Sequence, residues 1–173
     1  MAKGTTILIT GMPGSGKTTL FKRFVEELRY LKPVGFYTAE IRKHGKRRGF
    51  RLNSLDGRTG ILAHVDFQTG YRVGKYGVDV AGFEAFIEPL TDRVTKGGLV
   101  MIDEIGKMEC FADGFRKIIK DIINSDTPLI ATIAQKGGGF IAELKNQPHV
   151  QLFKLTRENQ DILFDQICSD LKV

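Results

Sequence analysis

The segment from Gly11 to Thr18 reads Gly-Met-Pro-Gly-Ser-Gly-Lys-Thr and matches the pattern G-x-x-x-x-G-K-[ST] in full. An apolar run at 7–9 precedes it and apolar residues at helical spacing follow it, so the order is strand, loop, helix. Glycines let such a loop curl until its N–H groups point inward, beside the positive end of the helix dipole. We therefore expect a phosphate-binding loop. Its candidate binding residues are Gly11, Met12, Pro13, Gly14, Ser15, Gly16, Lys17, Thr18 and Thr19.

Two side chains of this segment have separate expected roles. Lys17 would reach the β- and γ-phosphates of a nucleotide, and the Thr18 hydroxyl would ligate a magnesium ion that bridges them. The alternative is a glycine-rich turn with a solvated lysine, which the flanking strand and helix patterns disfavour.

A second polar element follows the apolar run 99–102, which is typical of a parallel strand buried on both faces. This run ends in Asp103-Glu104. We expect the strand to lie beside the strand of the phosphate-binding loop, so that Asp103 becomes a second magnesium ligand. Glu104 would orient or deprotonate the attacking water. For Glu104 the alternative is a solvated carboxylate or an ion pair with Lys107.

Strand and helix patterns alternate along the rest of the chain. Helices are expected from the loop to Pro33, from the cap Asp79 to about 95 with a kink or restart at Pro89, and from 157 to 171 with Thr156 as cap. A further helix is expected from about 111 to 123 and a short one after 139, and the segment 66–77 reads as a loop. Besides the first, the expected strands are 34–41, 50–55, 61–65, 99–102, 128–134 and 149–155.

This alternation predicts an α/β fold in three layers with a mostly parallel central sheet, to which the strands 34–41 and 50–55 add an antiparallel hairpin. A chain of 173 residues with 42% hydrophobic and 27% charged residues suits one domain, so we expect 1–173 to be a single unit. No apolar run approaches the about 18 residues that a membrane helix needs. We expect a cytoplasmic monomer without membrane contact, whose cysteines, Cys110 and Cys168, are reduced packing thiols.

The net charge of +6 is concentrated in the segment 42–51, which contains lysines and arginines but no acid. A solvated hairpin tip, a contact with the nucleotide and a nucleic-acid partner are the three alternatives. Few aromatic residues are interleaved with these cations, so base stacking has little support, and this disfavours a nucleic-acid partner. Arg42, Arg47, Arg48, Arg58 and Arg72 are all candidates for an arginine finger.

Two further polar residues are expected near the γ-phosphate. Thr132 and Gln135 lie late in, or just after, the strand 128–134, where a side chain could sense the phosphate or hold water. Ordinary hydrogen bonding at a strand end is the alternative.

Several of these segments together resemble a known family. The phosphate-binding loop, the segments 35–40, 48–50 and 73–76, and above all the string Asp103-Glu104-Ile105-Gly106-Lys107-Met108-Glu109 are similar to the small nucleoside-triphosphatases of the thermophilic and cancer-related type. The resemblance spans nearly the whole chain. It implies a RecA-like core and slow, magnesium-dependent hydrolysis of several nucleoside triphosphates, ATP and GTP included, to diphosphate and phosphate with little base preference.

Two other function classes share the phosphate-binding loop. A kinase would need a second substrate, whereas a hydrolase releases phosphate from nucleotide and magnesium alone. A nucleic-acid-stimulated ATPase would turn over faster with DNA or RNA in a salt-dependent way.

Overall fold

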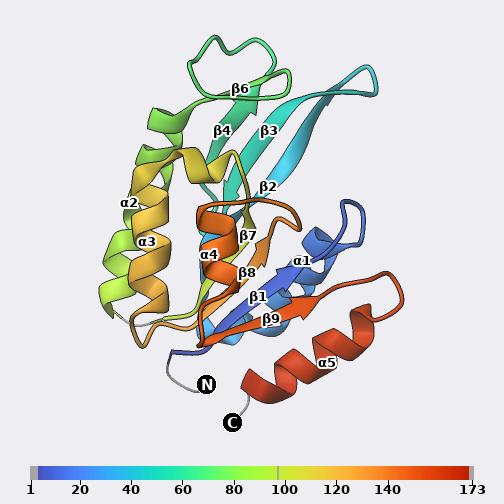
Figure 1. Ribbon diagram of the computed structural model, residues 1–173, viewed down its shortest axis with the longest axis vertical. Coiled ribbons are helices and arrows are strands. Elements are labelled where there is room, and N and C mark those ends of the chain that lie inside the picture. Colours follow the sequence, from blue (N-terminus) through green and yellow to red (C-terminus); the bar gives the residue numbers. More distant parts are fainter. Residues whose placement is uncertain (1–3, 97, 172–173) are drawn as a thin grey trace.

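The computed structural model describes residues 4–96 and 98–171, and one large sheet organises them (Figure 1). The strands are β1 Thr6–Thr10, β2 Val34–Lys43, β3 Lys46–Ser54, β4 Thr59–His64, β5 Arg72–Val73, β6 Tyr76–Val78, β7 Val100–Ile105, β8 Leu129–Ile133 and β9 Val150–Lys154. The helices are α1 Lys17–Glu27, α2 Val80–Lys96, α3 Asp113–Ile123, α4 Phe140–Lys145 and α5 Gln160–Leu171, with short 3₁₀ helices η1 Arg29–Leu31 and η2 Glu109–Phe111.

The sheet has the strand order β5-β6-β4-β3-β2-β7-β8-β1-β9. From β2 to β9 neighbouring strands are parallel, and from β2 to β5 they are antiparallel. The expected α/β class is confirmed, and the antiparallel part is larger than one hairpin because β4, β5 and β6 extend it. The sheet is therefore mixed, with β2 as the strand that its two halves share.

The prediction that the Asp103 strand lies directly beside the strand of the phosphate-binding loop is wrong. Ile130 of β8 pairs with Ile7 of β1 on one side and with Met101 of β7 on the other, so β8 lies between the loop strand and the Asp103 strand. Both β7 and β8 are short, buried apolar strands, and their local patterns do not distinguish which of them is the neighbour of β1.

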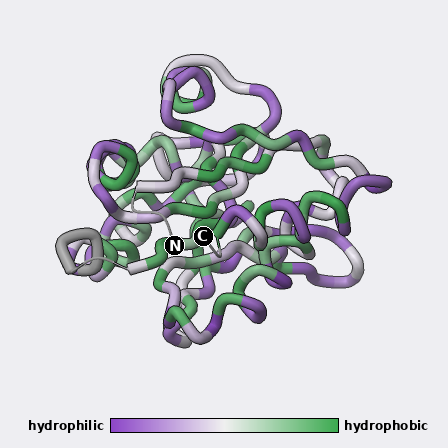
Figure 2. The backbone as a smooth tube through the Cα atoms, turned by 90° about the horizontal axis from the view of Figure 1, so that it is seen from below, coloured by the Kyte–Doolittle hydropathy of each residue, from purple (hydrophilic) through white to green (hydrophobic). Residues whose placement is uncertain are grey.

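Helices cover both faces of the parallel half, which gives the three layers (Figure 1). Because side chains alternate along a strand, Ile7 and Ile9 of β1 pack with α1 and α5 on one face, while Leu8 belongs to the core under α2, α3 and α4. Figure 2 shows the hydrophobic segments gathered in the middle of the molecule.

The start of α2 is confirmed, and of the two alternatives at Pro89, a kink or a restart, the restart does not occur. Asp79 caps the helix, since its Oδ1 accepts a hydrogen bond from the Gly82 N–H at 2.9 Å. The helix then runs through Pro89 without a restart. The segment 66–77, expected as a loop, contains β5 and the beginning of β6.

The start of α5 also differs from expectation. The helix begins at Gln160, and Thr156 is not its cap. Instead the Asn159 side chain closes the preceding turn: its Oδ1 accepts from the Thr156 N–H at 2.8 Å and its amide donates to the Lys154 carbonyl at 2.9 Å.

Neither cysteine forms a disulfide within the described residues, and Cys168 of α5 packs in the core that this helix shares with α1. Among the helices of the described ranges, none has the length and apolar character needed to cross a bilayer.

Candidate active site

The loop between β1 and α1 has the tight geometry expected of a phosphate-binding loop. Gly14 and Gly16 have φ angles of 76° and 96°, in the left-handed region that favours glycine. The Ser15 N–H donates to the Met12 carbonyl at 3.1 Å, which closes the turn directly before α1 begins at Lys17. The N-terminus of α1 therefore opens at this loop, with its unpaired N–H groups and positive dipole end.

The loop residues differ in their exposure. Met12 is 65% exposed, whereas the Ser15 side chain is buried with a hydroxyl that has no hydrogen-bond partner in the described chain. Pro13 and Thr19 line the cavity in front of the loop.

The Lys17 ammonium lies over the loop. Its Nζ donates to the carbonyl oxygens of Gly11 at 2.9 Å and Met12 at 3.2 Å. A positive charge is thus held where the loop amides converge, as an anion site requires.

Thr18, Asp103 and Thr132 meet although they come from three different elements. Thr18 Oγ1 donates to Asp103 Oδ2 at 2.7 Å, and the Thr132 hydroxyl donates to Asp103 Oδ1. The contact is possible despite the intervening β8 because α1 packs over the face of the sheet that contains Met101 and Ile130. The predicted juxtaposition of Asp103 with the loop is therefore present.

Asp103 is only 3% exposed. Burial raises the pKa of this carboxyl, while the hydroxyls of Thr132 and Thr18 and the charge of Lys17 act to lower it. Two hydroxyl hydrogen bonds thus compensate part of the cost of burying the carboxylate.

Glu104 follows Asp103 through a cis peptide bond and is half-buried. Burial raises its pKa, Lys17 opposes this shift, and the negative charge of Asp103 adds to it. A carboxyl with a raised pKa is a stronger base when ionised, which suits proton abstraction from water.

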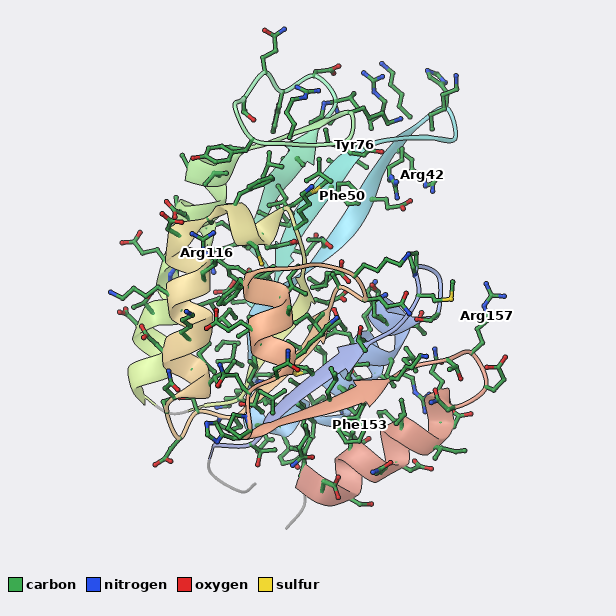
Figure 3. The ribbon with its side chains drawn as sticks, in the orientation of Figure 1. Arg42, Phe50, Tyr76, Arg116, Phe153 and Arg157 are labelled. Atoms are coloured by element: carbon green, nitrogen blue, oxygen red, sulfur yellow. The ribbon has the colours of Figure 1, made fainter. Side chains whose placement is uncertain are left out.

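Two cavities of about 360 Å³ flank the loop. The first lies between the loop and the β2–β3 hairpin, and the second lies between the loop and the end of β8. Lys17 and Glu104 line both, so Glu104 is placed where the cavities meet. From the hairpin side the first cavity is lined by Thr38, Ala39, Glu40 and Phe50. Figure 3 labels Phe50 on β3.

The structure also places the other sequence candidates. Gln135 lines the second cavity, near Glu104 and Lys17. In the basic segment, Arg42 and Arg47 both pair with Glu40 of β2, and Arg48 pairs with Asp66. Neither lining contains any of the arginine-finger candidates, which are Arg42, Arg47, Arg48, Arg58 and Arg72.

Glu109 is a residue near the site that sequence reasoning missed. It is 5% exposed, and burial raises its pKa to about 8. A Cβ built on Gly106 would lie 2.9 Å from Glu109 Oε2 and 3.1 Å from Glu104 Oε1, so the two carboxyls flank this glycine. The sequence around Glu109 gives no specific signal that this acid is buried, because acids are mostly exposed and the neighbouring Met108, Cys110 and Phe111 could be buried without it.

Known proteins match this chain over nearly its full length. A family model described as NTPase matches residues 6–168. Nucleoside-triphosphatase THEP1 of Thermotoga sp. (strain RQ2) is 42% identical over 167 residues, 96% of this chain and 95% of that protein. The crystal structure of THEP1 from Aquifex aeolicus has a TM-score of 0.87 at 35% identity and covers 97% of this chain and 99% of its own.

A solution structure of a human cancer-related nucleoside triphosphatase has a TM-score of 0.79 at 32% identity, with 96% of both chains covered. With a phosphate-binding loop, two adjacent acids and these relatives, the chain belongs to the nucleoside-triphosphatase family, hydrolases that act on phosphoric anhydrides.

Proposed function

We propose that this nucleoside-triphosphatase hydrolyses ATP, GTP and other nucleoside triphosphates to diphosphate and phosphate, requires magnesium and has low base specificity. The observation that carries the proposal is the 2.7 Å hydrogen bond from Thr18 to Asp103, which places a hydroxyl and a carboxylate together at the phosphate-binding loop.

The residues present fit a magnesium ion. Magnesium prefers oxygen ligands and keeps several waters, so one or two protein groups suffice beside the substrate phosphates. Thr18 Oγ1 and the Asp103 carboxylate are such groups, and they already touch. When bound, the ion would neutralise charge on the triphosphate.

The chain's own residues account for the remaining tasks. Lys17 and the loop amides would stabilise negative charge as it develops on the transferred phosphoryl group, which is an electrostatic contribution. Glu104 would orient the attacking water and accept its proton, and its place between the two cavities supports this role.

The position of the polar groups supports low base specificity. The two charged side chains that line both cavities, Lys17 and Glu104, come from the start of α1 and from β7, where they would serve the triphosphate that all these substrates share.

The test is phosphate release from ATP, GTP, CTP and UTP, with and without magnesium and without any second substrate. Glu104→Ala should bind nucleotide as the wild type does and lose about 10²-fold or more in kcat, because only a positioned base is removed. Lys17→Ala should lose both binding and turnover. Glu88→Ala, which removes an exposed acid of α2, is the control. An unchanged kcat in Glu104→Ala would remove Glu104 from the mechanism, and a strict need for an acceptor would identify a kinase.

A further inference from the structure

We propose that the β9–α5 loop, residues 155–159, holds the nucleoside part of the substrate, and that Arg157 is the side chain that contacts it. This inference rests on the proposed function, because it assigns the other end of the same substrate.

The strand order gives the direction in which the nucleoside must lie. β8 and β7 are on one side of β1, and they bring Thr132, Asp103 and Glu104 to the loop. The γ-phosphate has to face this side, where the water-orienting carboxylate is. β9 is on the opposite side of β1, paired with it from Thr6↔Val150 to Thr10↔Lys154. A triphosphate laid across the loop therefore directs its nucleoside toward the segment that follows β9.

That segment is packed firmly against the phosphate-binding loop. The Leu155 N–H donates to the Thr10 carbonyl at 2.7 Å, and the Gln160 side chain donates to the Gly16 carbonyl at 3.3 Å. A Cβ on Gly16 would lie 2.1 Å from Gln160 Nε2. Together with the Asn159 hydrogen bonds described above, these contacts fix both ends of the β9–α5 loop relative to the phosphates.

Arg157 extends from this loop toward the phosphate-binding loop (Figure 3). One of its guanidinium nitrogens lies 4.0 Å from the position that a Cβ on Gly14 would take. The side chain is exposed, and apart from the charge of the adjacent, exposed Glu158 no hydrogen bond or ion pair within residues 4–96 and 98–171 holds the guanidinium. By contrast, Arg23 on nearby α1 is already paired with Asp161 of α5. Arg157 is thus a cation beside the loop that is available to a ligand.

The chemistry of a guanidinium suits a substrate whose base varies. Its plane stacks on the face of any base and its N–H groups reach ribose oxygens, without reading the base edge. Such a contact would increase affinity for nucleoside triphosphates in general, and so it is consistent with low base specificity.

The experiment compares substrates with and without a nucleoside. KM and kcat are measured for ATP, GTP and CTP in the wild type, Arg157→Ala and Arg157→Lys, together with the inhibition constant of inorganic triphosphate against ATP. Arg157→Ala should raise KM for all three nucleotides by about tenfold, leave kcat within about twofold and leave the inhibition constant of inorganic triphosphate unchanged. Arg157→Lys should restore little, because an ammonium lacks the stacking plane.

Arg29→Ala is the matched control, since Arg29 is an exposed arginine on η1 that pairs only with Glu26 in the described chain. An unchanged KM for the nucleotides in Arg157→Ala would overturn the inference. So would an equal rise in the inhibition constant of inorganic triphosphate, which would show that Arg157 contacts the phosphate chain. Absence of phosphate release by the wild type would instead refute the proposed function.

Discussion

The protonation of the buried Glu109 carboxyl makes the stability of the folded protein depend on pH. Burial raises its pKa to about 8, and the negative charges of Glu104 and Asp103 add to this effect, whereas the backbone N–H groups of Glu109 and Gly106 favour the ionised form. In the unfolded chain the same carboxyl titrates near 4.5. Between these two values the folded protein holds a proton that the unfolded chain has lost. The contribution to stability is therefore complete below about pH 4.5 and is lost as the pH rises to about 8.

Glu109→Gln removes this titration while it keeps the size of the side chain. Its free energy of unfolding, measured with urea at several pH values from about 5 to 8, should rise relative to the wild type as the pH increases. Asp165→Asn, which alters an exposed acid of α5, should show no such trend. A difference between Glu109→Gln and the wild type that stays constant with pH would contradict the assignment of the proton to Glu109.

At the scale of elements, the pairing of β2 with β7 depends on Gly35. Its φ is +141°, and a Cβ there would lie 1.7 Å from the Met101 carbonyl oxygen of the neighbouring strand. Gly35→Ala should therefore separate the strands locally and destabilise the fold by about 3 kcal/mol. Because the same ladder pairs Tyr37 with Asp103, turnover should fall as well.

Gly138→Ala is the control for Gly35→Ala, since Gly138 lies outside the strands and nothing lies within 4 Å of the added Cβ. Urea unfolding of both variants at one pH measures the effect. Equal stability of the two would mean that β2 and β7 tolerate a wider spacing at Gly35 than their hydrogen bonds indicate.

Local signals account for what the sequence predicted well at this scale. The glycine pattern and the helix after it, the Asp79 cap and the apolar run before Asp103 are each encoded within a few residues. The predicted start of α5 is wrong because Thr156 and Asn159 are both residue types that cap helices and close turns, and the pattern alone does not show that Asn159 bonds back to Thr156 and Lys154.

Long-range packing accounts for the rest. β8 lies between β1 and β7, and the similar apolar patterns of β7 and β8 give no local signal of which one is the neighbour of β1. Burial of Glu109 and the approach of Arg157 to Gly14 likewise depend on segments distant in the sequence. The reach of Thr18 to Asp103 was nevertheless predictable, because both motifs belong to the carboxyl ends of parallel strands.

For the whole molecule, the candidate site joins the two halves of the sheet. The first cavity is lined by the phosphate-binding loop of the parallel half and by Thr38 and Phe50 of the antiparallel half. The sheet is continuous through β2, and one hydrophobic cluster contains both Leu8 of β1 and Leu62 of β4. The parallel half also has a second cluster of its own between β1, α1 and α5, so it is the shared cluster on which the prediction of a single domain rests.

We therefore expect one cooperative unfolding transition, which magnesium and a nucleoside diphosphate shift as a whole. A ligand at 100 times its Kd stabilises the folded state by about 2.7 kcal/mol, which for a chain of this size corresponds to a rise in Tm of about 5–10 °C. Differential scanning calorimetry with and without magnesium and ADP measures the shift, and Lys17→Ala should abolish it because the loop then lacks its ammonium. Two separate transitions, or a shift confined to part of the unfolding heat, would show that the antiparallel half unfolds independently of the nucleotide site.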